Sequence, residues 1–82
     1  MAVVFLPGLL AAEAGGQKRF EVEAVSLREA LAGLPVVDLV LDERGEVRSL
    51  VHVYVDGERV KDLAEPLAPA AEVRIVAAIA GG

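Results

Sequence analysis

The sequence predicts a two-layer α+β domain in which one main helix packs on one face of a mixed β-sheet. Three observations support this fold class: several short apolar or alternating segments, one capped segment with helical periodicity, and an Asp56-Gly57 turn between two apolar segments. A chain of 82 residues is enough for one such domain. Hydrophobic residues make up 55% of the chain, and much of that total is Ala and Val, so we expect a small aliphatic core.

The first two expected strands lie near the N-terminus. Residues 2–6 form a short run that is apolar on both faces, as in a strand in the middle of a covered sheet. We expect the rest of residues 2–12 to be a loop, because Pro7-Gly8 interrupts the run. The segment Gly15-Gly16-Gln17-Lys18 predicts a hairpin-type turn, and residues 17–24 alternate between apolar and polar side chains. This alternation indicates a half-buried strand.

The main helix is expected directly after this strand. Ser26-Leu27-Arg28-Glu29 fits a capping box, in which the serine and glutamate side chains accept hydrogen bonds from backbone N–H groups at the helix start. One apolar stripe follows at helical spacing: Leu27, Ala30, Leu31 and Leu34. Gly33 and Pro35 end the helix. Because so short a helix is not stable alone, we expect its apolar stripe to lie on the sheet.

The second half of the chain predicts a hairpin and a final strand. Residues 36–41 fit either a strand or a short helical segment, and residues 42–45 form a turn. Residues 51–55 run into Asp56-Gly57, a signal for a two-residue turn of the primed type, with residues 58–60 returning. Residues 73–76 are the last expected strand. Pro66 and Pro69 keep the connection before it out of regular structure.

Composition and charge exclude several classes of function. The net charge of −5 argues against nucleic-acid binding, which depends on clustered Lys and Arg. The absence of Cys rules out disulfides, zinc-thiolate sites and a thiol nucleophile, and it is compatible with a reducing cytosol. No apolar run approaches the roughly 20 residues needed to span a bilayer. We therefore expect a cytoplasmic protein that contacts neither nucleic acid nor a membrane.

The last two residues, Gly81-Gly82, are the most distinctive motif. Without Cβ atoms they can enter a channel too narrow for other side chains, which places a candidate reactive carboxylate at the end of the backbone. Glycine is also common at chain ends that fray. The segments that precede the motif favour a functional role for it.

Four segments together resemble the ubiquitin-like β-grasp sulfur carriers of the MoaD/ThiS type. They are Gly15-Gly16-Gln17-Lys18, Ser26-Leu27-Arg28-Glu29-Ala30-Leu31, Val51-His52-Val53-Tyr54-Val55-Asp56-Gly57-Glu58, and Val76-Ala77-Ala78-Ile79-Ala80-Gly81-Gly82. This family includes the molybdopterin synthase small subunit, the thiazole sulfur carrier and a cysteine-biosynthesis carrier. The resemblance implies a β-grasp domain over residues 1–77 and a flexible tail over residues 78–82.

The resemblance also implies a carrier rather than an enzyme. A MoeB/ThiF-like adenylating enzyme would use ATP to adenylate Gly82, and a sulfur donor would convert it to a thiocarboxylate. Gly81, Ala80 and Ile79 would thread into this partner, and the carrier itself would bind no cofactor. The sulfur would pass to a synthase of the molybdopterin large-subunit or cysteine-synthase type. The alternatives are a modifier joined to lysine through the Gly-Gly end, or a β-grasp interaction module.

Two positions depart from the family pattern. His52 stands where relatives usually have Asn, and Ala70-Ala71-Glu72 replaces an Asp-Gly-Asp-like turn. Both departures bear on partner choice rather than on the terminal chemistry. Gly15-Gly16-Gln17-Lys18 is more similar to the cysteine-pathway carriers than to the thiazole carriers.

Other candidate residues have simpler interpretations. His52 lies beside Tyr54 on the face opposite the valines, and no partner nucleophile is suggested, so we expect a surface or partner-contact role. Asp38, Asp42 and Glu43 match no metal-ligand spacing and are expected in a solvated turn. The segment at residues 15–18 lacks the glycine spacing of a P-loop. Five leucines fill the core or form an exposed patch beside the final strand: Leu9, Leu10, Leu50, Leu63 and Leu67.

Overall fold

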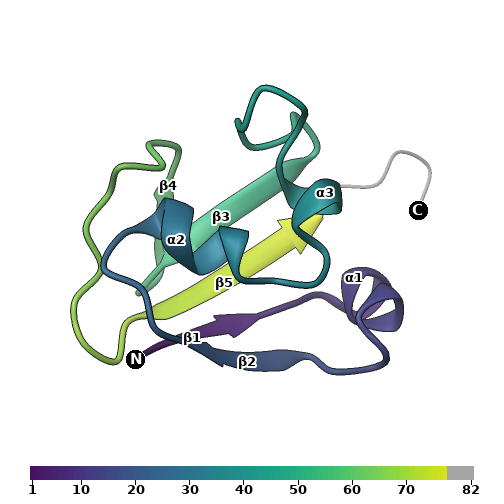
Figure 1. The fold of residues 1–82 in the computed structure, drawn as a ribbon, viewed down its shortest axis with the longest axis horizontal. Coiled ribbons are helices and arrows are strands. Elements are labelled where there is room, and N and C mark those ends of the chain that lie inside the picture. Colours follow the sequence, from purple (N-terminus) through teal and green to yellow (C-terminus); the bar gives the residue numbers. More distant parts are fainter. Residues whose placement is uncertain (78–82) are drawn as a thin grey trace.

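The computed structural model describes residues 1–77, which form a five-stranded mixed sheet with its main helix on one face (Figure 1). The elements are β1 (Ala2–Phe5), α1 (Gly8–Glu13), β2 (Arg19–Val22), α2 (Leu27–Ala32), α3 (Val37–Val40), β3 (Val51–Val55), β4 (Glu58–Val60) and β5 (Glu72–Ala77). The strand order is β2-β1-β5-β3-β4. The central pair β1 and β5 is parallel, and the other pairs are antiparallel. The predicted α+β class with a mixed sheet is confirmed.

The core lies between the sheet and the helices. Its side chains are aliphatic, and no polar or charged side chain in the described part of the chain is buried. The largest fully buried side chains are Leu27, Leu31, Ile75, Val4, Val40, Val53 and Val73. They come from three strands and two helices, so the core joins every layer of the fold.

Helix α2 begins where the capping signal predicts. The Ser26 Oγ accepts a hydrogen bond from the Glu29 backbone N–H at 3.3 Å. The Glu29 carboxylate accepts one from the Val25 N–H at 2.9 Å. The first two helical N–H groups donate to carbonyls of the segment after β4, each at 2.9 Å. The helix start is thus satisfied by its own side chains and by the chain that crosses it.

Helix α1 was missed, since its residues were expected to form a loop. Pro7, in extended conformation, precedes its first residue and loses nothing by lacking an N–H there. Leu10 and Ala11 turn inward and are buried. The expected hairpin-type turn is instead the end of this helix: the Gly16 N–H donates to the Ala11 carbonyl at 2.7 Å. Gly15 and Gly16 have φ of +74° and +89°, as glycines after a helix often do.

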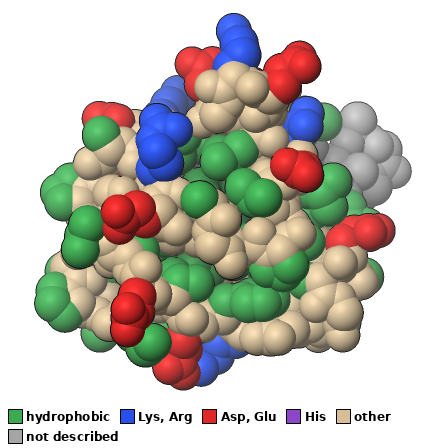
Figure 2. All heavy atoms as spheres, viewed as in Figure 1, with side chains coloured by type: hydrophobic (Ala, Val, Ile, Leu, Met, Phe, Trp, Pro, Cys, Tyr) green, Lys and Arg blue, Asp and Glu red, His purple; other side chains and the backbone are tan. Residues whose placement is uncertain are grey.

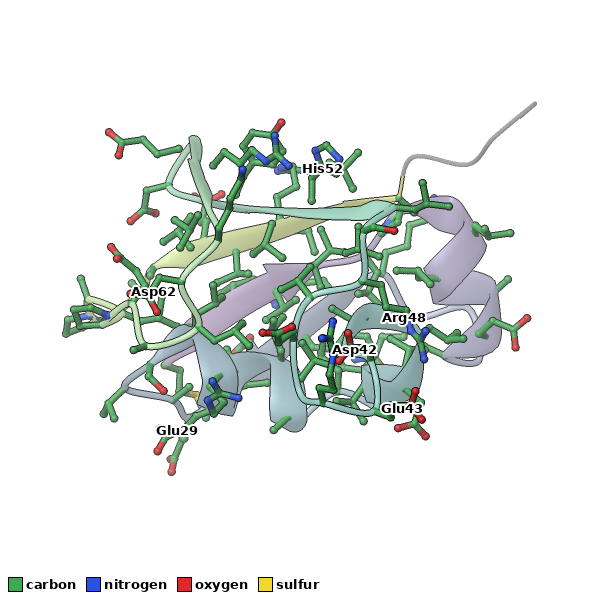
Figure 3. All side chains as sticks on the ribbon, turned by 90° about the horizontal axis from the view of Figure 1, so that it is seen from above. Glu29, Asp42, Glu43, Arg48, His52 and Asp62 are labelled. Carbon is green, nitrogen blue, oxygen red and sulfur yellow. The ribbon has the colours of Figure 1, made fainter. Side chains whose placement is uncertain are left out.

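Two further expectations are settled by the layers of the fold. The ambiguous residues 36–41 contain the one-turn helix α3 rather than a strand. β1 was expected to be covered on both faces, but only Ala2 and Val4 are buried while Val3 and Phe5 are half-buried. The reason is that the helices cover one face of the sheet and leave the other free (Figures 1 and 3).

The β3–β4 turn has the predicted primed geometry, because Asp56 and Gly57 have φ of +50° and +89°. We expect Gly57→Ala to lower the free energy of unfolding by about 1–2 kcal/mol, the cost of a Cβ in the left-handed region. Chemical denaturation measures this. Gly8→Ala is the matched control, because an added Cβ at either position meets nothing within 4 Å and only Gly57 has positive φ. Equal losses in both variants would contradict the backbone argument.

Candidate functional site

The candidate site is the surface around the end of β5. β5 is a central strand, paired with β1 on one side and with β3 on the other, and its last residue Ala77 lies opposite Val51. The predicted site residues Ile79, Ala80, Gly81 and Gly82 follow Ala77 directly but lie outside the described residues. The pairing with β1 ends at Arg74, and the pairing with β3 continues to Ala77, so β3 fixes where the chain leaves the sheet. The surfaces on either side of Ala77 therefore define what a partner meets on approaching the tail.

On the free face of the sheet, cationic and aromatic side chains alternate in one row across all five strands. The strand registers place them side by side in the order Arg19, Phe5, Arg74, Tyr54, Arg59. We call this set the cation–aromatic row. Each strand contributes one member, so the row exists only when the whole sheet is assembled.

The geometry of this row favours an interface with another protein. The Arg74 Cζ lies 4.8 Å from the centroid of the Phe5 ring, a distance at which a cation and a ring attract. Phe5 and Tyr54 are half-buried, so each ring is held while one side stays accessible. Aromatic residues and Arg are enriched where proteins bind one another. Its central member, Arg74, lies on β5, the strand that leads to the Gly-Gly end.

His52 and Val76 extend this face toward Ala77. They lie opposite each other in the β3–β5 register. Val76 is 41% exposed, and His52 is half-buried beside Tyr54, on the face opposite the buried valines, where the sequence predicted it. Figure 3 shows His52 projecting from the side of the sheet away from Asp42 and Glu43. Its position fits a partner contact.

On the other side of Ala77 lies an apolar groove, defined by exposed Leu9, Leu39 and Leu50. It has a volume of about 570 Å³ and Ala77 lines it. These three leucines are 56%, 42% and 55% exposed. The five leucines weighed from sequence thus divide: Leu9 and Leu50 form the patch beside the final strand, and the other three are buried. Leu39 was not singled out, because the segment containing it was ambiguous.

Asp42 and Glu43 lie in a solvated turn, as expected, whereas Asp38, expected in the same turn, lies in helix α3. The Asp42 Oδ1 accepts hydrogen bonds from the backbone N–H groups of Arg44 at 2.9 Å and Glu46 at 3.0 Å. These bonds lower the pKa of the Asp42 carboxyl, and the bond from the Glu46 N–H has the largest effect. Within residues 1–77, no group of three or more His, Cys, Asp or Glu could hold a metal ion. Asp42 therefore stabilises the turn with its charge.

None of the described helices is long and apolar enough to cross a membrane.

No protein-family model matches the sequence, and no curated protein matches it. Solved structures do. A chain in the Amycolatopsis orientalis BexX/CysO complex matches with a TM-score of 0.84 and 22% identity, covering 100% of both chains.

Two further structures are similar. CysO of Mycobacterium tuberculosis matches with a TM-score of 0.83 and 25% identity, covering 96% of this chain and 100% of that one. SAMP1 of Haloferax volcanii matches with a TM-score of 0.78 and 25% identity, covering 99% of this chain and 98% of that one. These neighbours confirm the resemblance that the sequence predicted. The chain has the ubiquitin-like β-grasp fold, which it shares with CysO and SAMP1.

Proposed function

We propose that this protein is a sulfur carrier whose Gly82 carboxylate is activated by a partner enzyme. The carboxylate attacks the α-phosphate of ATP, and pyrophosphate leaves. A persulfide then displaces AMP, and reduction of the resulting acyl disulfide by a thiol leaves a thiocarboxylate. The carrier provides the tail and the surface that positions it, while the enzyme provides ATP and the sulfur donor.

One observation carries this proposal: Gly81-Gly82 follows, after a few small or apolar residues, the central strand of a β-grasp domain. A free carboxylate is a poor acyl donor, and adenylation supplies a good leaving group. Residues without Cβ atoms can reach the α-phosphate through a narrow channel, and a docked domain makes the reaction effectively unimolecular. The proposal requires Gly82 to bear the terminal carboxylate of the native protein.

The cation–aromatic row is the proposed docking surface for the adenylating enzyme. We expect Arg74→Glu to raise the KM for the carrier at least about tenfold, because it reverses the charge over Phe5 in the middle of the row. Adenylation kinetics measure this. Lys18→Glu, with the same change of charge at an exposed position outside the row, should change KM less than about twofold. Equal effects would mean that only net charge matters.

Intact mass of the protein from its native host tests the proposed chemistry. A carrier shows replacement of one oxygen by sulfur and returns to the carboxylate after the sulfur passes to a small molecule. The synthase that accepts it would be of the cysteine or molybdopterin type, and the complex of CysO with BexX supports transfer to a separate partner protein. A native chain with residues beyond Gly82, or with no sulfur-containing form, would contradict the proposal.

The second candidate function is protein modification, because a neighbour from Haloferax volcanii is a small archaeal modifier protein. A modifier keeps its acyl group as a stable amide on lysine, whereas a carrier loses it. Tagged protein recovered from the host under denaturing conditions separates the two. Branched peptides joining Gly82 to lysine, without a thiocarboxylate form, would favour the modifier.

A further inference from the structure

A second concave surface crosses the edge of the sheet beside β4. It lies between the N-terminal part of β3, the turn that precedes it and the segment that follows β4, and its volume is about 430 Å³. Four cationic side chains line it: Arg28, Arg48, Arg59 and Lys61. We call this surface the basic groove. It holds half of the eight Lys and Arg residues of a chain whose net charge is −5.

None of these four cations forms an ion pair with an acidic side chain of residues 1–77. The ion pairs formed within residues 1–77 involve Arg19 and Arg44, neither of which lines the groove. Two of the four are held in place by neutral partners. The Arg28 Nη1 donates to the Gly45 carbonyl at 3.2 Å, and the Arg48 Nε donates to the Asp38 carbonyl at 3.0 Å. Each guanidinium keeps further N–H donors for a ligand.

The two acidic side chains in the basic groove are already engaged elsewhere. The Glu46 carboxylate forms an ion pair with Arg44 at 3.1 Å. The Asp62 Oδ1 accepts a hydrogen bond from the Ala64 N–H at 2.9 Å. The groove therefore contains four cations and two carboxylates, of which Glu46 is already paired with a cation outside the groove. The groove keeps an excess of positive charge on an acidic protein.

The floor of the groove includes the start of β3, where the Val51 N–H donates to the Arg48 carbonyl at 2.9 Å. β4 pairs with Val53 to Val55 only, so Val51 and His52 at the start of β3 have no partner in β4. Both residues line the groove. In Figure 2 most of the visible Lys and Arg side chains lie toward the upper end of the molecule, where Asp and Glu side chains also occur, and another lies at the lower edge. This combination suits a short extended ligand with negative side chains.

We propose that the basic groove docks an extended acidic segment of a partner protein. Carboxylates of such a segment would pair with Arg28, Arg48 and Lys61, and Arg supports bidentate pairing. The acidic surface outside the groove repels a long polyphosphate, which favours a short peptide over nucleic acid. This interaction goes beyond sulfur carriage. Only Arg59 is shared with the cation–aromatic row, so the two surfaces can be tested separately.

The test uses the whole protein and an oligoglutamate peptide in an NMR titration. We expect backbone amide shifts at Arg28, Arg48 and Lys61, and weaker binding as salt rises from about 0.05 to about 0.5 M. Arg28→Gln with Lys61→Gln should weaken binding about tenfold, since two charge pairs are lost. Lys18→Gln with Arg19→Gln removes the same charge outside the groove, from residues that pair with none of its acidic side chains, and should change binding less than about twofold.

Three outcomes would overturn this proposal: equal weakening in both double variants, shifts centred on Phe5 and Tyr54 instead of the groove, or a single-stranded oligonucleotide binding the same residues more tightly than the peptide. Inorganic phosphate should bind far more weakly than oligoglutamate, and equal affinity would reduce the groove to a simple anion site. Adenylation of Gly82 by the enzyme alone should be unchanged in Arg28→Gln with Lys61→Gln. Failure of the groove and failure of the carrier chemistry are thus distinguishable.

Discussion

Deleting Gly82 is expected to abolish activation of the carboxyl terminus while the domain stays folded. The deletion moves the terminal carboxylate back by one residue, roughly 3.3–3.6 Å of extended chain. A displacement of even about 1 Å from the reacting geometry can cost 10²-fold in rate. The shortened chain keeps every residue of the core cluster described for residues 1–77, so we expect no change in the thermal midpoint. ATP–pyrophosphate exchange with a cognate adenylating enzyme measures the activation.

Gly81→Ala tests whether the tail must be narrow, independently of how long it is. This variant keeps the terminal carboxylate in place but adds one methyl group, so we expect slower adenylation rather than its loss. Both variants should unfold at the wild-type temperature. If the chain without Gly82 supports exchange at the full-length rate, the terminal-carboxylate mechanism is wrong. Equal kinetics of Gly81→Ala and wild type would leave Gly81 without a steric role.

Local signals in the sequence were sufficient for α2 and the β3–β4 hairpin. Ser26 and Glu29 satisfy the helix start through neighbours in sequence, and Asp56-Gly57 can take positive φ at little cost. Such elements depend on interactions within a few residues. Helix α1 was not predicted, although residues typical of a helix start and a helix end flank it. Pro7 stands before its start, and Gly15-Gly16 follows its end, but the same residues also suit a loop.

The two surfaces proposed for partners could not be predicted from the sequence. The cation–aromatic row depends on the register of strands that are far apart in the chain: Phe5 meets Arg74, which meets Tyr54. Alternation gives the face of each residue within its strand, but not its neighbour on the next strand. The basic groove likewise joins a helix, a turn and a strand edge. In the sequence its four cations are dispersed, and only the topology brings them together.

The strained backbone conformation at Ala70 could not be predicted from the sequence either. Ala70 has φ of +63°, a conformation that residues with a Cβ rarely adopt. It lies in the Ala70-Ala71-Glu72 segment that departs from the family pattern. Its N–H donates to the Met1 carbonyl at 3.0 Å, which ties the chain before β5 to the start of β1. This long-range bond accompanies the strained conformation, and no local pattern indicates it.

Leu31→Ala is expected to lower the free energy of unfolding by roughly 2–5 kcal/mol. The Leu31 side chain is fully buried on the apolar stripe of α2, which lies on the sheet. Truncation removes its favourable transfer from water and leaves a cavity that close-packed neighbours fill only in part. Small domains have only about 5–15 kcal/mol of stability, so the loss is a large share of the total. Chemical denaturation with a fixed denaturant slope measures it.

Leu9→Ala is the matched control, because it removes the same atoms from a side chain that is 56% exposed at the rim of the apolar groove. A surface position should change stability by no more than about 0.5 kcal/mol. A loss of that size at Leu31 would contradict the packing of α2 on the sheet. A loss of several kcal/mol at Leu9 would instead place α1 within the core. A large loss at Leu31 and a small one at Leu9 would mean that α2 packs into the core. Leu9, which lines the groove beside Ala77, would then be available to contact a partner.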